Sequence, residues 1–87
     1  MRVVFTEAAW DDFRLLAQDR QLLKRVNQLI ADIQRGGYDG IGKPERLSGD
    51  LSDYWSRRID DRQRLVYRID EDGTLEIVQC WGHYSDR

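Results

Sequence analysis

The chain has 87 residues and a net charge of −2, from 14 basic and 16 acidic residues. This length predicts one domain over residues 1–87, and a hydrophobic share of 40% is too high for a disordered chain. The single cysteine, Cys80, excludes an intrachain disulfide and fits a reducing compartment. No segment has the length and apolarity of a secretory signal or a membrane span, so we expect a cytoplasmic protein without membrane association.

The distribution of charge is less even than its sum. A net negative charge argues against a general nucleic-acid binder, because such proteins are usually basic. Residues 43–68 nevertheless carry seven basic and five acidic groups, whereas residues 69–87 carry one and five. Within residues 43–68 the arginines concentrate at Arg57, Arg58, Arg62, Arg64 and Arg68. Either a solvated strand face or an anion-binding face explains this gathering.

The expected order of elements is β-α-α-β-β-β. A short strand at residues 2–5 precedes Thr6 and Asp19, which are good N-caps for two successive helices. The second helix is expected to end at Gly36-Gly37. Apolar residues recur at helical spacing in both segments; they are Ala9, Trp10, Phe13, Leu16 and Ala17, then Leu22, Leu23, Val26, Leu29, Ile30 and Ile33.

A glycine-containing loop over residues 38–50 separates the helices from three predicted strands at residues 54–59, 64–69 and 75–81. Asp72-Gly73 predicts a tight hairpin turn, and residues 60–63 form a polar turn. The pattern predicts an α+β fold, an antiparallel sheet with both helices packed on one face. The opposite face of the sheet would then be free.

Alternation along the strands predicts which side chains reach the free face. Arg57 and Arg58 are adjacent and must point to opposite faces, so Arg57 is expected to be solvated or in contact with a helix. Arg64 and Arg68 share a parity opposite to the apolar residues of their strand and are expected on the free face. Trp10 and Phe13 are expected in the core and Cys80 as a small buried strand residue; Trp55 and Trp81 are ambiguous.

A carboxylate, a histidine and several arginines are the side chains that could take part in catalysis. They are Glu45 in the glycine loop, His83 after the last strand, and the arginines named above. A lone histidine with a lone cysteine makes no zinc site of standard spacing, so neither metal nor cofactor is expected. This set suits RNA cleavage, in which a base activates a 2′-OH, an acid protonates the leaving oxygen and cations stabilise the phosphate.

Short blocks from the first strand to residue 84 resemble the YoeB-type toxins of the RelE superfamily. The blocks are Trp10-Asp11-Asp12, Gly42-Lys43-Pro44-Glu45, Leu51-Ser52, Trp55-Ser56-Arg57-Arg58-Ile59, Arg64-Leu65-Val66-Tyr67 and His83-Tyr84. Each block alone is weak, but the ordered set at family spacing is specific.

The resemblance implies a RelE-like toxin fold and ribosome-dependent cleavage of mRNA in the decoding site. It implies that Glu45 is the general base, His83 the general acid and Arg64 the cation that stabilises the phosphate. Lys43, Arg58 and Tyr84 look like supporting residues that hold phosphate or position the nucleotide. The implied partners are mRNA on the ribosome, a YefM-like antitoxin and a second copy in a homodimer.

The sequence departs from the family pattern at two places. Gln63 stands where family members often carry a histidine, and we interpret it as peripheral. Residues 85–87 extend beyond the usual His-Tyr ending and are expected to be a frayed tail.

Two other functions are compatible with the same fold. One is a non-enzymatic toxin of the related ParE type, which acts on a topoisomerase and generally lacks the glutamate–histidine pair. The other is a binding module that engages an antitoxin without cutting RNA.

Overall fold

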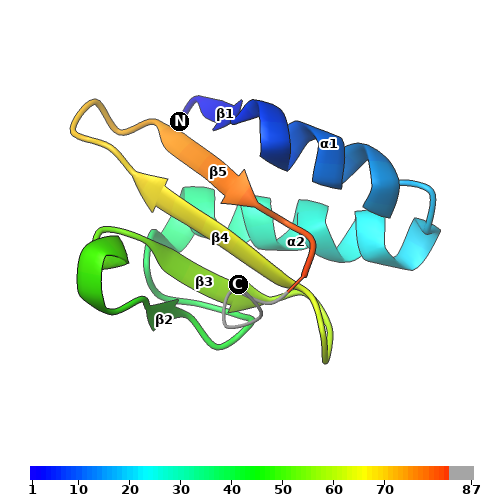
Figure 1. Cartoon of the computed structure of the whole chain (residues 1–87). Helices are drawn as coiled ribbons and strands as arrows, with labels where there is room; N and C mark the ends of the chain where they lie inside the picture. The colour runs from blue at the N-terminus through cyan, green and yellow to red at the C-terminus, as the bar shows by residue number, and fades with distance from the viewer. Residues whose placement is uncertain (83–87) are drawn as a thin grey trace.

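The computed structural model describes residues 1–82. Five strands form one sheet in the order β1-β5-β4-β3-β2; in Figure 1 the second helix passes behind the sheet, and the first helix lies next to its β1–β5 edge. The elements are β1 (Val3–Phe5), α1 (Glu7–Leu16), α2 (Arg20–Gly36), β2 (Glu45–Arg46), a 3₁₀ turn η1 (Gly49–Leu51), β3 (Trp55–Arg58), β4 (Arg64–Ile69) and β5 (Leu75–Gln79). The α+β class with two helices on one face is confirmed.

The sheet is mixed, whereas an antiparallel sheet was expected. β1 pairs in parallel with β5, with Val3 opposite Leu75, and the other three pairings are antiparallel. The difference arises because β1 is followed by two helices and is not joined to its neighbour by a hairpin. A hairpin requires antiparallel strands, whereas a long connection also permits a parallel pair. The two-residue β2 lies inside the segment expected to be a loop, and two residues are too few to show alternation.

The predicted helix boundaries are confirmed by their caps. Thr6 Oγ1 accepts a hydrogen bond from the Ala9 amide at 3.1 Å. Asp19 Oδ1 accepts from the Gln21 and Leu22 amides at 2.9 and 3.1 Å. Gly37 then ends α2 with a φ of 65°, a conformation that costs glycine little. Within residues 1–82, neither helix has the length and apolarity needed to span a bilayer.

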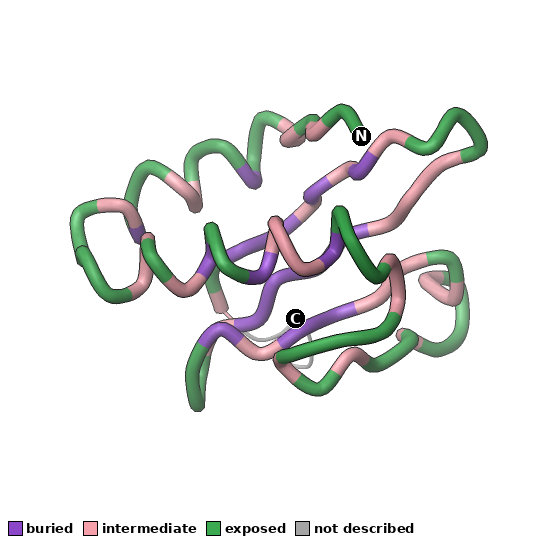
Figure 2. The backbone as a smooth tube through the Cα atoms, turned by 180° about the vertical axis from the view of Figure 1, so that it is seen from behind, coloured by how far each residue is buried: buried purple, intermediate pink, exposed green. Residues whose placement is uncertain are grey.

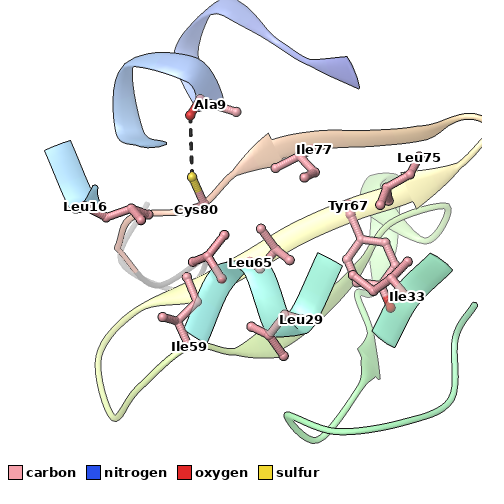
Figure 3. Close-up of a cluster of buried hydrophobic side chains, with 11 residues drawn as sticks. Ala9, Leu16, Leu29, Ile33, Ile59, Leu65, Tyr67, Leu75, Ile77 and Cys80 are labelled. Carbon is pink, nitrogen blue, oxygen red and sulfur yellow. Dashed lines mark hydrogen bonds between the residues drawn. The ribbon is translucent and has the colours of Figure 1, made fainter. Parts of the chain in front are cut away.

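The core lies between the helices and the central strands β4 and β5. Figure 3 shows apolar side chains of both strands pointing toward α2, and Figure 2 shows that the buried backbone runs along these strands. Fully buried residues of this cluster are Leu65, Tyr67, Leu75 and Ile77 from the sheet and Val26, Leu29 and Ile33 from α2. The alternation expected for the strand at residues 64–69 is therefore confirmed.

Trp10 was expected in the core, but this expectation is wrong, since the residue is 48% exposed. The inward side of α1 is taken by Ala9 and Leu16, both buried. Trp10 lies about 100° further round the helix than Ala9. Its ring stacks on Phe13 with centroids 5.5 Å apart and meets the Phe5 ring edge-on at 5.6 Å, so the indole is partly covered without entering the core. Phe13 itself is partly buried against the core.

Cys80 is fully buried, as expected, although it lies just beyond the end of β5. A register shift between Val66 and Tyr67 of β4 and their neighbours on β5 interrupts the alternation. The Cys80 thiol thereby donates to the Ala9 carbonyl at 3.5 Å (Figure 3), and Trp81 remains 40% exposed. Burial raises the pKa of Cys80 to about 12, which leaves the thiol protonated and a poor nucleophile.

Arg57 is the helix-contacting side chain of its pair, and it is fully buried. Its Nη1 donates to Asp32 of α2 and, at 3.1 Å, to the Ile41 carbonyl. Its Nη2 donates to the carbonyls of Gly37 and Asp39, each at 2.9 Å.

The hydroxyl of Tyr67 completes this network. It accepts from Arg57 Nε at 3.1 Å and donates to the Gly37 carbonyl at 3.3 Å. Burial raises the pKa of Tyr67, so the hydroxyl keeps the proton that it donates. The two side chains together fix the loop that leaves α2 and leads to β2.

Replacing Asp32 by Asn should destabilise the fold by about 3–5 kcal/mol, because it leaves the buried Arg57 charge uncompensated. Urea unfolding followed by tryptophan fluorescence measures this change. The control is Arg35→Gln, because Arg35 forms an exposed ion pair with the same Asp32. This change should lower the free energy of unfolding by less than about 1 kcal/mol.

The ion pair between Asp32 and Arg57 also makes the stability of the fold depend on pH. The hydrogen bond from Arg57 lowers the pKa of Asp32 below its ordinary value of 3.8. Its stabilising contribution is therefore complete above that ordinary value and is lost as pH falls through the lower, folded-state pKa. An Asp32→Asn protein that loses as much stability on acidification as the wild type would contradict this assignment.

Candidate functional site

Glu45 and Arg64 come together across three strands. Glu45 on β2 lies opposite Ser56 on β3, and Ser56 lies opposite Val66 on β4, two residues after Arg64. Arg64 Nε donates to Ser56 Oγ at 3.0 Å, and its Nη2 lies 3.7 Å from Glu45 Oε2. Ser56 therefore stands between the two charged residues and orients the guanidinium.

Ser56 was not identified as a site residue from the sequence. The sequence did contain one indication, because Ser56 is two residues before Arg58 and therefore lies on the same face of β3. A serine on a strand face has no distinguishing chemistry until its cross-strand neighbours are known.

The burial of the two charged side chains differs. The Arg64 side chain is 11% exposed, whereas that of Glu45 is 68% exposed. Arg64 Nη2 is buried and has no hydrogen-bond acceptor among the described residues. A buried donor without an acceptor costs free energy, and an anionic oxygen would satisfy it. The Glu45 carboxylate is thus open to solvent, and it lies beside the Arg64 guanidinium, which is held in place and has an N–H group available to an anionic acceptor.

The loop that carries Lys43 is pressed against the sheet. The Gly42 carbonyl accepts from the Arg58 amide at 2.7 Å. A Cβ on Gly42 would lie 2.9 Å from Leu29 Cδ2, so a larger residue would push the loop away. Lys43 follows with a φ of 50°, unusual for a residue with a side chain. Its position next to the catalytic candidates is therefore set by backbone packing.

Arg58 is the cross-strand neighbour of Arg64 and shares its face of the sheet. Its side chain is 36% exposed and donates to Asp61 at 2.7 Å. Arg25, Lys43 and Arg58 line one open hollow, together with Asp60 and Asp61. The two supporting cations expected from the sequence are therefore close to each other.

Arg57, Arg62 and Arg68 are the other arginines of the predicted gathering. Arg68 is on the free face, as expected, and its Nε donates to Glu76 at 2.9 Å. Arg62 is exposed in the turn between β3 and β4. Arg57 points to the helix side of the sheet, where it binds Asp32 and the loop after α2.

His83 and Tyr84 lie outside the described residues. The last described residue, Gly82, is held at both of its backbone polar groups. Its amide donates to Gln63 Oε1, and its carbonyl accepts from the Arg64 amide at 2.9 Å. Gln63, which we interpreted as peripheral, thus contacts the residue that precedes His83 in the sequence.

Among residues 1–82, no three histidine, cysteine or carboxylate side chains lie close enough together to bind a metal ion. The chemistry available in this part of the chain is that of a carboxylate, guanidinium groups and an ammonium group.

Residues 5–84 match a protein family described as the YoeB-like toxin of bacterial type II toxin-antitoxin systems. The chain is 55% identical over 85 residues to Toxin YoeB of Streptomyces coelicolor, which covers 97% of this chain and 100% of that protein.

Two solved structures from Staphylococcus aureus have the same fold. The YoeB dimer superposes with a TM-score of 0.89 at 40% identity. YoeB in a heterotetrameric YoeB-YefM toxin-antitoxin complex superposes with a TM-score of 0.88 at 38% identity. Both comparisons cover 97% of this chain and 98% of the other.

Proposed function

Because this chain belongs to the family of YoeB-like toxins of bacterial type II toxin–antitoxin systems, we propose that it is an endoribonuclease that cuts mRNA in the decoding site of cytoplasmic ribosomes. The observation that carries the proposal is the contact between Glu45 and Arg64. A carboxylate that faces solvent lies 3.7 Å from a buried guanidinium nitrogen that has no acceptor among the described residues. A base beside a guanidinium group that can bind an anionic oxygen is the arrangement that phosphodiester cleavage needs.

In the proposed reaction, Glu45 removes the proton from a ribose 2′-OH. The 2′-oxygen attacks the adjacent phosphorus while the bond from phosphorus to the 5′-oxygen breaks. Arg64 stabilises the charge that builds up on the non-bridging oxygens, and His83 protonates the departing 5′-oxygen. The products are a 2′,3′-cyclic phosphate and a 5′-OH, and acid, base and cation are all side chains of this chain.

Lys43 and Arg58 support this reaction in the proposal by holding phosphates on either side of the cleaved bond. Both line one hollow, and Arg58 is the cross-strand neighbour of Arg64, which favours this role. Tyr84 is proposed to position a nucleotide, on the basis of the family resemblance alone.

Changing Glu45 or His83 to Gln should slow cleavage of ribosome-bound mRNA by about 10²–10⁴-fold, since each change removes one proton-transfer group. Primer extension on programmed ribosomes measures the rate, and end-group analysis identifies the cyclic phosphate. Glu71→Gln, an exposed change in the β4–β5 turn, is the matched control and should cut normally.

Near wild-type rates for both site variants would refute the assignment of acid and base. A 5′-phosphate on the product would point to water as the nucleophile. A wild-type protein that arrests growth without cutting any mRNA would favour a ParE-like or purely binding role.

Free mRNA should be cut much more slowly than the same mRNA in programmed ribosomes. A net charge of −2 gives little long-range attraction for a polyanion. An 87-residue chain also offers little surface to align a flexible strand for attack by its own 2′-OH, and such alignment can be worth about 7–11 kcal/mol. Initial rates at equal toxin concentration and fixed salt test this, and equal rates would favour a free-standing ribonuclease.

We also propose a YefM-like antitoxin as partner, because a relative at 38% identity was solved in a YoeB-YefM complex. An acidic segment that folds on binding is expected to cover the free sheet face that carries Arg58 and Arg64. A homodimer is proposed from the S. aureus YoeB dimer.

Arg58→Glu and Arg64→Glu should each weaken antitoxin binding, because they place like charges against the acidic segment. Calorimetric titration with the antitoxin peptide measures the loss of affinity. Arg14→Glu, on the exposed side of α1, is the control. If Arg14→Glu weakens binding and the two sheet variants do not, the antitoxin covers the helices instead.

A further inference from the structure

Gly82 is fastened to the start of β4 by two consecutive residues. The side chain of Gln63 accepts the hydrogen bond from the Gly82 amide. The backbone amide of Arg64 donates to the Gly82 carbonyl at 2.9 Å. Both polar groups of this peptide segment are therefore satisfied by neighbours about twenty positions earlier in the sequence, and the chain cannot swing freely at this point.

Gln63 is itself held by a turn with its own hydrogen bonds. The Gln63 amide donates to Asp60 Oδ1 at 2.7 Å, and its carbonyl accepts from the Ile59 amide at 2.9 Å. Asp60 Oδ1 also accepts from the Arg62 amide at 2.8 Å. Because the backbone of Gln63 is fixed at both ends, its side-chain oxygen is presented to Gly82 from a rigid base.

Gly82 has a φ of 86°, in the left-handed region that favours glycine. The space around it is open, since the nearest atom to an added Cβ is Gln79 Nε2 at 3.9 Å. The glycine is thus required by its backbone conformation and not by crowding. The hydrogen bonds from Gln63 and Arg64 and this conformation together fix the backbone of Gly82.

Arg64 links the same point to the candidate site. Its backbone holds the Gly82 carbonyl, while its side chain contacts Ser56 and lies 3.7 Å from Glu45. We propose that Gln63 is a positioning residue for the general acid, because it holds Gly82, the residue that precedes His83 in the sequence, against the start of β4. This inference rests on the proposed function, because it assigns Gln63 a role only if His83 is the general acid.

The experiment uses the full chain and compares three variants with the wild type. Gln63→Met has a similar size and lacks the acceptor, whereas Gln63→Glu keeps an oxygen at the same place. Gln34→Met is the matched control on α2, where the Gln34 side chain donates to the Met1 carbonyl, away from the site. Two quantities are measured: hydrogen exchange of the Gly82 amide by NMR, and kcat and KM for cleavage of ribosome-bound mRNA.

We expect faster Gly82 exchange in Gln63→Met and a kcat about 10- to 100-fold lower, because a small misplacement of a catalytic group can cost about 10²-fold. KM should change little, since Gln63 does not touch RNA in this scheme. Gln63→Glu should restore both slow exchange and most of kcat, which a merely destabilised turn would not explain. Gln34→Met should behave as the wild type.

A Gln63→Met protein that loses Gly82 protection but keeps the wild-type kcat would overturn the inference, as would a Gln63→Glu protein as slow as Gln63→Met. A wild-type protein that cuts no RNA would instead overturn the proposed function, and the two failures are distinguishable because the exchange measurement needs no RNA.

Discussion

A guanidinium group that is removed from water must have its N–H groups satisfied, and in Arg57 this requirement shapes the segment between α2 and β2. Three of its acceptors are backbone carbonyls of Gly37, Asp39 and Ile41, and a fourth is the Asp32 carboxylate. No hydrophobic side chain could bind three carbonyl groups of a loop. The loop therefore follows the surface of the guanidinium and delivers Lys43 and Glu45 to the edge of the sheet.

Neighbouring residues on the two faces of β3 have different roles. On the helix side, Arg57 organises the loop, and on the free side Ser56 orients Arg64. Gln63 and Arg64, the first residue of β4, then join this arrangement to the end of the described chain through Gly82. The candidate site is thus assembled from the chain segments around one end of β3 and β4, and it needs no contribution from α1 or β1.

The sequence predicted the features that depend on local chemistry and regular alternation. Caps at Thr6 and Asp19, the glycine stop after α2 and the two faces of β4 all follow from neighbours within a few residues. Glu45 and Arg64 were identified as a pair through the family resemblance, and the structure brings them within 3.7 Å.

The features that could not be predicted depend on distant contacts. The parallel pairing of β1 joins strands at nearly opposite ends of the described chain. The roles of Ser56 and Gln63 depend on which residues lie across the sheet or at its end, and a serine or glutamine signals neither. Trp10 was misplaced because its ring is covered by Phe5 and Phe13 at the side of α1 and does not enter the core.

The parallel strand β1 has a consequence for the order of folding. The hairpins β3–β4 and β4–β5 close short loops, whereas pairing of Val3 with Leu75 closes a loop that contains almost the whole described chain. Loop-closure entropy makes such long-range contacts the slower ones to form. β1 should therefore dock after the antiparallel strands have assembled, with α1 following it onto β5. Opening of this N-terminal unit would be the first step of unfolding, and it would leave Glu45 and Arg64 in register.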